Sequence, residues 1–455
     1  MNEAPLPTQS VVSQSLLPPA PTLEQRPRSP SKLRSSLTAC SAEGLTAEIV
    51  GACFSGAVVT AWGLELRASP VLLGVLWGLP HFGQIFQLPA SWVTSRFGRK
   101  RVAVGMHALA RQITLPIALL PFVDISVDAK RAILVTLFAL SSLFAVLGHN
   151  AWLAWMGDLV PGRVRGAYFG RRTSICTAAA TIAGLSVASA MDAGRMQSVL
   201  GPVLAGVLVA RSIAGVVTTV LMSRQHDPLL DEALPKPELP RLSEATLPFA
   251  DRGYRKLLAY RAAWGIATGL TASIAAVLTL EALGLGFFGV ATYAAVVAGL
   301  RVATTPLWGR TLDRIGGRPV LVACSLGTAL SSLAWVGATT GAAWLIWLDA
   351  LVCGLMLGGQ ELAVFTLPLA SAPSRHRPLF AAASVMVGGV AYGVASVAGG
   401  ALTSTMSVRA LLLVSAAWRV FATVLATRLD EPRQRRAPEG PTLSALEREA
   451  RASVP

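Results

Sequence analysis

Ionisable and amide side chains stand inside long apolar runs of this sequence, where burial in lipid is costly. A charged group in the hydrocarbon has to pair with a partner or face a water-filled cavity, and such groups commonly serve binding or proton transfer. Six of these residues are candidates for solute binding or proton coupling: His81, Gln84, Arg111, His149, Asp349 and Glu361. The chemistry available to them is ion pairing, hydrogen bonding and proton exchange.

Arg111 and Glu361 are the strongest candidates of the six. A fixed guanidinium either holds an anionic group or pairs with an acid, and the sequence leaves both roles open for Arg111. A carboxyl group in a cavity of low dielectric constant takes up a proton more readily than it does in water, which makes Glu361 a candidate for proton coupling. Aligning the two halves of the chain places His149 opposite Glu361. A structural role, as a buried polar group satisfied by its neighbours, stays open for each of the six.

The elements that must position these residues are membrane-spanning helices. The chain has 455 residues, of which 53% are hydrophobic and 14% are charged, whereas a soluble domain carries roughly 25% charged residues. Several apolar runs exceed the ~20 residues that a helix needs to cross the hydrocarbon. Twelve spans are predicted, at about 44–64, 70–93, 102–122, 132–156, 173–191, 199–222, 258–281, 285–308, 319–339, 342–366, 380–403 and 408–428.

The twelve runs form two sets of six, so the fold class is an all-α polytopic membrane protein with two six-helix bundles. A polar, proline-containing segment separates the two sets. The predicted domains are a disordered cytoplasmic tail at 1–42, an N-terminal bundle at 43–222, a cytoplasmic linker at 223–257, a C-terminal bundle at 258–428 and a cytoplasmic tail at 429–455.

The basic residues report the orientation of the chain. The formal net charge is +15, but nucleic acid is not an expected partner because the basic residues cluster between apolar runs. Cytoplasmic loops carry an excess of Lys and Arg, and here the basic residues concentrate in alternate loops, near 96–101, 163–172, 310–318 and 375–377. These loops and both termini are therefore predicted to be cytoplasmic. Arg greatly outnumbers Lys, which is typical of GC-rich coding, so we expect a multi-pass protein of a bacterial inner membrane, embedded in the lipid bilayer.

Several common chemistries find no support in the sequence. The five cysteines have no metal-ligand spacing and are read as small core residues. A phosphate-binding loop of the Gly-x-x-x-x-Gly-Lys-Ser/Thr type is not found, and no convergent catalytic set is seen. We therefore expect no metal, no cofactor and no enzymatic activity.

Glycines recur at the spacing that lets helix backbones approach closely in lipid. Three pairs follow this small-xxx-small pattern: Gly74 with Gly78, Gly354 with Gly358, and Gly389 with Gly393. Such pairs predict close helix contacts on the second, tenth and eleventh spans.

A short basic loop follows the eighth span, and a degraded copy follows the second. The complete loop contains Gly309, Asp313, Arg314, Gly316 and Arg318, and the copy contains Ser91, Ser95, Arg96, Gly98 and Arg99. Ser91 stands where the complete loop has Gly309, and Ser95 where it has Asp313. The same loop follows the second span of each set of six spans, which predicts a chain built from two similar halves. Secondary transporters have such an architecture.

The motif Gly-x-x-x-Asp-Arg-x-Gly-x-Arg, in two copies at corresponding places, resembles the signature loop of the major facilitator superfamily. The resemblance implies two six-helix bundles around a central cavity, with one half rocking against the other so that the cavity opens to each side in turn. In that family the Asp, here Asp313, helps to latch the cytoplasmic side shut. The loop after the fourth span also resembles its counterpart in bacterial members, which makes Asp158 and Arg165 candidate partners of the latch.

The resemblance predicts a secondary active transporter that moves a small solute by alternating access and is coupled to protons. Because the spans carry few charges, efflux of an amphipathic metabolite or drug is slightly favoured. Uptake of an anionic metabolite held by Arg111 is the alternative, and a transport-inactive scaffold or sensor is a further one. The family is usually monomeric, and we expect a monomer here.

The missing acid at Ser95 predicts a latch that acts from one side only. Ser95→Asp would restore the second acid, stabilise the closed cytoplasmic side and favour the outward-open state. Crosslinking between cysteines placed across the cytoplasmic side should therefore increase in this variant. Unchanged crosslinking would contradict a one-sided latch.

Overall fold

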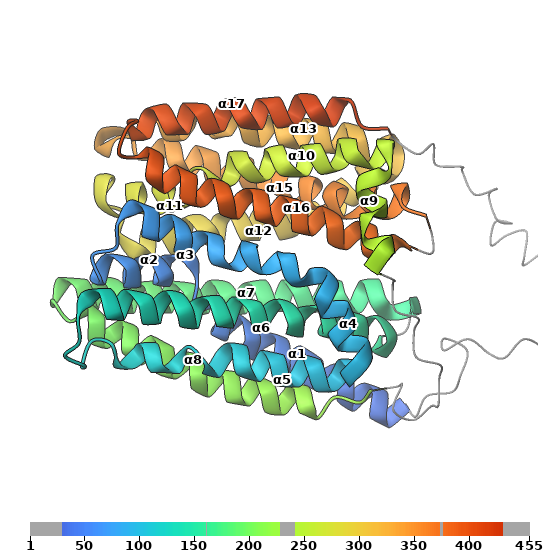
Figure 1. Ribbon diagram of the computed structural model, residues 1–455, viewed down its shortest axis with the longest axis horizontal. Coiled ribbons are helices and arrows are strands. Elements are labelled where there is room, and N and C mark those ends of the chain that lie inside the picture. The colour runs from blue at the N-terminus through green and yellow to red at the C-terminus, as the bar shows by residue number, and fades with distance from the viewer. Residues whose placement is uncertain (1–29, 161, 228–241, 374–375, 431–455) are drawn as a thin grey trace, which may run out of the picture.

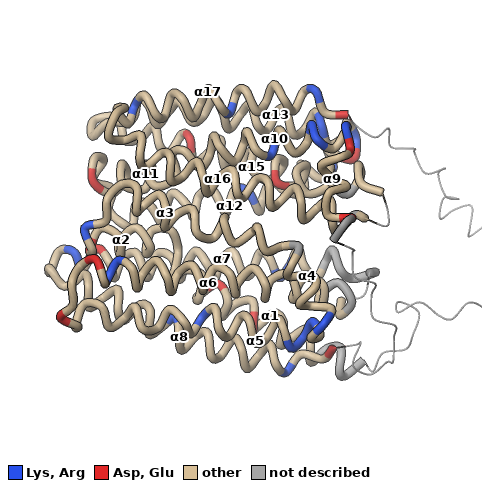
Figure 2. The backbone as a smooth tube through the Cα atoms, viewed as in Figure 1, with Lys and Arg blue, Asp and Glu red and all other residues tan. Residues whose placement is uncertain are grey.

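Helices account for the regular secondary structure of this chain in the computed structural model, which describes residues 30–160, 162–227, 242–373 and 376–430. The long helices run side by side, with the N-terminal half on one side of the molecule and the C-terminal half on the other (Figure 1). The first described helix begins, and the last described helix ends, at the same end of the molecule, which we call the terminal end; the opposite end is the far end (Figure 1). Lys, Arg, Asp and Glu gather toward both ends (Figure 2).

The N-terminal half forms six spans, and three of them are interrupted. The helices of this half are α1 (Pro30–Ala52), α2 (Gly56–Glu65), α3 (Pro70–Phe82), η1 (Gly83–Phe86), α4 (Gln87–Phe97), α5 (Arg99–Gln112), η2 (Leu115–Leu119), α6 (Val127–Leu159), α7 (Gly162–Met196) and α8 (Leu200–Ser223). The breaks separate α1 from α2, α3 from α4, and α5 from η2. Pro116 stands at the start of η2, where a residue without a backbone N–H costs least.

The C-terminal half follows a short connecting segment that contains η3 (Leu242–Thr246) and α9 (Leu247–Ala250). Its helices are α10 (Arg252–Gly269), α11 (Ala272–Val277), η4 (Leu278–Ala282), α12 (Gly286–Ile315), α13 (Gly317–Ser331), α14 (Ala334–Gly337), η5 (Thr340–Ala342), α15 (Trp344–Ser371), α16 (Arg377–Leu402) and α17 (Val408–Thr427). The order of elements repeats that of the first half, with a broken first span and a broken third span.

Twelve spans are confirmed by this arrangement. Within the described residues, eleven helical segments are long and apolar enough to cross a membrane, and the apolar segment at Pro70–Phe86 is shorter. This apolar segment ends at Phe86, the last residue of η1, and α4 follows it from Gln87 within the predicted span at 70–93. The boundaries differ in detail: α1 begins at Pro30, before the expected start of the bundle at 43, and α10 begins at Arg252 rather than at 258. The domain limits stay predictions.

The two halves meet along α3 and α16, and along α7 and α12. Backbones approach closely there: a Cβ added to Gly74 would lie 2.3 Å from the carbonyl oxygen of Ser396, and one added to Gly400 would lie 2.2 Å from that of Pro70. Ser396 Oγ donates a hydrogen bond to Gly74 O at 2.9 Å. All three predicted glycine pairs lie at close helix contacts. Besides Gly74, the paired glycines at these contacts are Gly78, Gly354, Gly358, Gly389 and Gly393.

An arginine brace is repeated in both halves, buried at Arg211 and partly buried at Arg419. Arg211 and Arg419 are each the twelfth residue of their helices, α8 and α17. Arg211 donates to Ala110 O and Arg419 donates to Thr328 O, both at 3.3 Å. Ala110 and Thr328 are in turn the twelfth residues of α5 and α13. The internal duplication therefore extends from the loop motif to the packing of the peripheral helices.

The α3–α16 contact predicts opposite effects for two glycine substitutions. Gly74→Ala should lower the thermal stability of the detergent-purified protein by about 1–3 kcal/mol, because the added methyl group displaces α16. Gly105→Ala, on α5, adds its methyl group where nothing lies within 4 Å and should be neutral or slightly stabilising. Melting curves of the two variants would test this, and equal melting temperatures would contradict the close α3–α16 contact.

Candidate functional site

A charged triad joins three helices of the N-terminal half. Glu43 of α1 is only 3% exposed. Its Oε2 accepts a hydrogen bond from Arg172 Nη2 of α7 at 3.0 Å, and its Oε1 lies 4.0 Å from Arg111 Nη2 of α5. A carboxylate removed from water in this way has to be compensated by partner charges, and two arginines supply them. Arg111 is therefore a member of an ion-pair cluster in this conformation, which was one of its two predicted roles.

Aromatic rings extend the triad toward α6. The Arg172 guanidinium lies 5.1 Å from the ring centre of Trp152, a distance at which a cation is attracted to the ring face. Trp152 is stacked in turn on His149, with ring centres 5.9 Å apart. The predicted candidate His149 thus adjoins the triad through Trp152, and no bond joins it to Glu361 among the described residues.

A chain of amides lies where the second and fourth spans meet. Gln87 Nε2 donates to Gln84 Oε1 at 2.6 Å, and Asn150 Nδ2 donates to Gln87 Oε1 at 3.1 Å. Beside them, His81 stacks on Tyr392 of α16 with ring centres 3.7 Å apart. These contacts place Gln84 and His81 at the boundary between the two halves, where a polar solute would find hydrogen-bonding groups.

Asp349 is satisfied as a structural group in the C-terminal half. It is 2% exposed, and its Oδ2 accepts hydrogen bonds from Tyr293 OH and Trp335 Nε1, both at 2.7 Å. Cys353 Sγ donates to Oδ1 at 3.3 Å. These bonds connect α12, α14 and α15 around a carboxylate that is closed to solvent, so the geometry favours the structural alternative for Asp349.

The ion pair between Arg301 of α12 and Glu361 of α15 is exposed, in contrast to the triad. Arg301 Nη1 lies 2.9 Å from Glu361 Oε1, and the two side chains are 38% and 57% exposed. Both residues lie well inside spanning helices. Charged groups at such a depth face water or protein rather than lipid, so this exposed pair is a candidate for contact with a solute or a proton.

The first copy of the repeated loop forms its contacts with other residues of the N-terminal half. Arg99 is 7% exposed and donates to Asp227 Oδ1 through Nε at 3.0 Å and Nη2 at 2.8 Å. This places Arg99 away from the predicted gating surface, because a buried guanidinium requires a carboxylate and Asp227 supplies it. Ser95 Oγ donates to Trp92 O at 2.9 Å, and Arg96 lies over the Phe97 ring at 5.9 Å.

The second copy of the loop shares the turn but leaves its acid exposed. Gly316 has a φ of 93° and Gly98 a φ of 88°, values that favour glycine, and each precedes the next helix. Asp313 is exposed and has no hydrogen bond or ion pair within the described residues. A Cβ added to Gly309 would meet only Leu362 at 3.7 Å, so no neighbouring helix requires a glycine there in this conformation.

The remaining loop residues add no contact to the candidate site. Arg314 is exposed, and Arg318 is partly buried with a partner of its own. The side chains of Asp158 and Arg165 lie outside the described part of the structure, so their roles as loop partners stay predictions.

Sequence reasoning missed the partners that define these clusters. Neither Glu43 nor Arg172 was among the predicted site residues; their proximity depends on the packing of α1 against α7. Arg211 and Arg261 carried a usable signal, since each is a single charge within an apolar run. Arg261 donates to Ser384 O at 3.3 Å.

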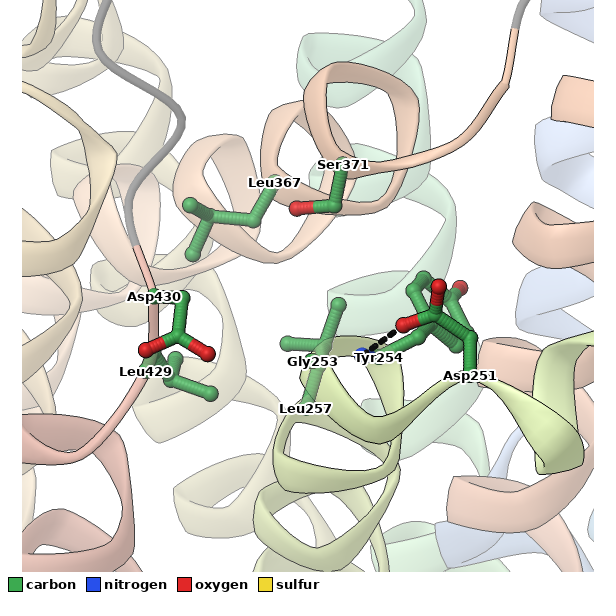
Figure 3. A pocket seen from close by; sticks show the side chains of 8 residues that line it. All are labelled: Asp251, Gly253, Tyr254, Leu257, Leu367, Ser371, Leu429 and Asp430. Carbon is green, nitrogen blue, oxygen red and sulfur yellow. Dashed lines mark hydrogen bonds between the residues drawn. The ribbon is translucent and has the colours of Figure 1, made fainter.

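The measurable cavities lie away from these clusters. One of about 200 Å³ opens at the terminal end of the C-terminal half, where Asp251 Oδ1 accepts a bond from Tyr254 N beside Asp430 (Figure 3). Another, of about 350 Å³, lies between the halves at the far end and is lined by Arg67, Arg195 and other residues. Within the described residues, no group of three His, Cys, Asp or Glu is placed to hold a metal ion.

The triad predicts a large loss of stability when one partner is removed. Glu43→Gln leaves two arginines without their carboxylate and should destabilise the protein by about 3–5 kcal/mol. Adding Arg172→Gln should recover part of this loss, because one unpaired charge is removed with it. Glu65→Gln, an exposed acid on α2, is the matched control. Thermal melting of the single and double variants measures the coupling, and additive effects would contradict a direct Glu43–Arg172 interaction.

Comparison with known proteins identifies the fold. A family model described as Major Facilitator Superfamily matches residues 262–453, and no curated protein matches the sequence. The chain is similar in structure to the nucleoside transporter NupG (TM-score 0.67, 11% identity, covering 86% of this chain and 98% of that one). It is also similar to the xylose transporter XylE from E. coli in an inward open conformation (0.65, 15%, 92% and 99%) and to a bacterial homologue of the iron transporter ferroportin in an inward-facing state (0.66, 15%, 88% and 99%). The sequence match covers the C-terminal half of the chain, and these solved transporters share its fold over both halves.

Proposed function

We propose that this protein is a secondary transporter that moves a small solute across a bacterial inner membrane by alternating access, coupled to protons. The observation that carries the proposal is the exposed Arg301–Glu361 pair, deep inside spanning helices. A charged pair with this exposure requires water at the middle of the membrane. A water-filled cavity between two halves that are closed at one end is the geometry that alternating access needs.

Closure at the far end supports this reading. Phe287 N and Phe288 N, at the start of α12, donate to the two carboxylate oxygens of Asp192 of α7, both at 2.8 Å. Ser396 Oγ also bonds Gly74 O between the halves, near the start of α3. At the terminal end, the loop acid Asp313 is without a partner among the described residues. With the terminal end in the cytoplasm, as the basic loops predict, this conformation faces inward.

Two acids are candidates for the coupling proton, and their surroundings differ. Glu43 is enclosed between two arginines, whereas Glu361 has one arginine partner and contact with the cavity. A proton that arrives through water reaches Glu361 without breaking a buried cluster, so we assign the coupling role to Glu361. A symporter of D-xylose and protons has the same fold, which makes such coupling compatible with this architecture.

Uptake is better supported than efflux by the charges inside the spans. The preference for efflux depended on few intramembrane charges, yet several arginines lie within the spanning segments, among them Arg111, Arg172, Arg211, Arg261, Arg301 and Arg419. Efflux of an amphipathic solute stays a prediction that flux measurements decide. A scaffold or sensor role would leave the exposed pair without a use.

Flux in proteoliposomes tests the proposed function. The purified protein is reconstituted with a pH-sensitive dye inside the vesicles, and a panel of small metabolites and drugs is added with and without an imposed pH gradient. Movement of protons that depends on one solute, and is absent from empty vesicles, supports transport. Solute binding to the folded protein without any flux would support the scaffold or sensor role instead.

The Asp192 bridge predicts a shift in the balance of conformations. Asp192→Asn removes a charge from the start of α12 and should weaken far-end closure by about 1–2 kcal/mol, a change of roughly 5- to 30-fold in the population ratio. Distances between spin labels at the far ends of α6 and α15 should then lengthen in a larger fraction of molecules. Asp128→Asn, whose partner Arg131 lies in the same half, is the control and should change nothing. An unaltered distance distribution in Asp192→Asn would contradict the bridge.

A further inference from the structure

We propose that Arg301 is the binding group for the anionic end of an amphipathic organic anion, such as a carboxylate, and that Glu361 releases Arg301 for this purpose when it takes up a proton. The inference depends on the proposed transport function and specifies the substrate class. Arg301 on α12 thus takes the anion-binding role that the sequence suggested for Arg111, because Arg111 is already paired within the Glu43 triad.

Glu361 points into the space between α10 and α12. Successive residues of a helix are rotated by about 100°. On α15, Gly358 faces α12, where an added Cβ would lie 2.9 Å from Thr305 Oγ1, and Gln360 faces α10, where its Nε2 donates to Tyr260 OH at 3.0 Å. Glu361 lies on the arc between these two contacts. Leu351 and Leu355, both exposed, lie on the other side of the α12 contact.

The arc between α10 and α12 is the inner one. Helix α12 packs against α7 of the N-terminal half, and α10 packs against α16, which packs against α3. The space between α10 and α12 therefore faces the N-terminal half rather than lipid. Glu361 and its partner Arg301 line that space, which accounts for their exposure at this depth.

Arg301 has hydrogen-bond donors that none of the described residues uses. Arg301 has five N–H donors, and its side chain forms one hydrogen bond within the described residues, to Glu361. Arg211, by contrast, donates to three oxygens and lies over an aromatic ring. Arg261 packs its guanidinium against Gly388. Among these three arginines, Arg301 combines exposure with unused donors, and its planar fork suits a carboxylate.

An apolar surface lies beside the Arg301–Glu361 pair. Phe365 follows Glu361 by one helical turn on α15 and is 67% exposed. Its ring offers an apolar contact on the face of the helix that carries the acid. A solute with one anionic group and an apolar body matches both features, and this describes an amphipathic organic anion.

The charges at the Arg301–Glu361 site balance when one proton and one anion bind together. In the pair, the guanidinium and the carboxylate cancel. A proton from the aqueous phase adds to a Glu361 oxygen, the Arg301–Glu361 attraction is lost, and the free guanidinium then holds one monovalent anion. One proton and one negative charge have entered the site, so the complex is again neutral and can cross as one unit. Transport of a monovalent anion should therefore be electroneutral.

Arg301 is the charged group that faces Glu361. Titratable groups on the helices packed around the pair have other partners or face other contacts: Tyr260 on α10, Cys324 on α13, Tyr392 on α16, and Arg172 and Asp192 on α7. The pH dependence of anion binding is accordingly assigned to Glu361 alone.

Binding to the full-length purified protein tests the assignment. Calorimetry is run at pH 6 and pH 8 with a panel of aromatic and aliphatic monocarboxylates, starting from benzoate and phenylacetate, and with the matching neutral amides. The wild type should bind an acid of the panel but not its amide, and more tightly at pH 6. Arg301→Gln should weaken binding about 10- to 100-fold, and Arg301→Lys should weaken it less. Arg310→Gln, near the end of the same helix, is the control.

Glu361→Gln separates coupling from binding. This variant should bind the anion equally at both pH values and should still exchange it across vesicles, but a pH gradient should no longer drive accumulation. In the wild type, uptake should follow the pH gradient and ignore an imposed membrane potential.

Specific outcomes overturn the inference while leaving the transport function intact. Flux of a neutral solute that survives Arg301→Gln would do so, as would potential-driven uptake of the monovalent anion. If no carboxylate binds to a wild type whose melting curve shows it is folded, the anion assignment is wrong. If the anion binds through Arg301 but no solute crosses the membrane, the site stands and transport fails.

Discussion

A charge inside the hydrocarbon needs an opposite charge, a set of hydrogen bonds or water, and the described charges of this protein are arranged by that constraint. Glu43 meets it with two arginines, Asp349 with three neutral donors, and Arg211 with backbone carbonyls and a ring. Each solution ties several helices together. Most intramembrane charge therefore serves to hold the bundles rigid, so that each half can move as one body.

The Arg301–Glu361 pair meets the same constraint differently, through one ion pair whose side chains stay exposed. Its single hydrogen bond joins two helices of one half. A pair of this kind is able to exchange partners at low cost, whereas the Glu43 triad is not. The contrast in burial between the two clusters separates a structural role from a binding role more clearly than residue type does.

Close backbone contact is the second physical basis of the architecture. In lipid there is no hydrophobic force between apolar helices, so small residues that allow close packing decide which helices meet. Gly74 and Gly400 bring α3 and α16 within reach of direct carbonyl contacts. The interface between the halves thus depends on shape, with few hydrogen bonds to break, which suits the proposed alternating access.

The sequence by itself determined the twelve spans, their division into two sets of six, the repeated turn at Gly98 and Gly316, and the glycines at helix contacts. These features follow from local composition and spacing, which the length of a span and the geometry of a helix translate directly into structure. Arg111 and Glu361 were also recognisable as intramembrane charges. Their partners were not, because a single sequence gives no distances between helices.

Only the tertiary structure decided which charge meets which. It paired Arg111 with Glu43 rather than with an anion, enclosed Arg99 with Asp227, and left Glu361 exposed beside Arg301. Residues far apart in the chain met through the packing of α1, α5, α7, α12 and α15. The rotation of each helix about its axis, which packing against neighbouring helices fixes, determined whether a charge became a brace or a binding group.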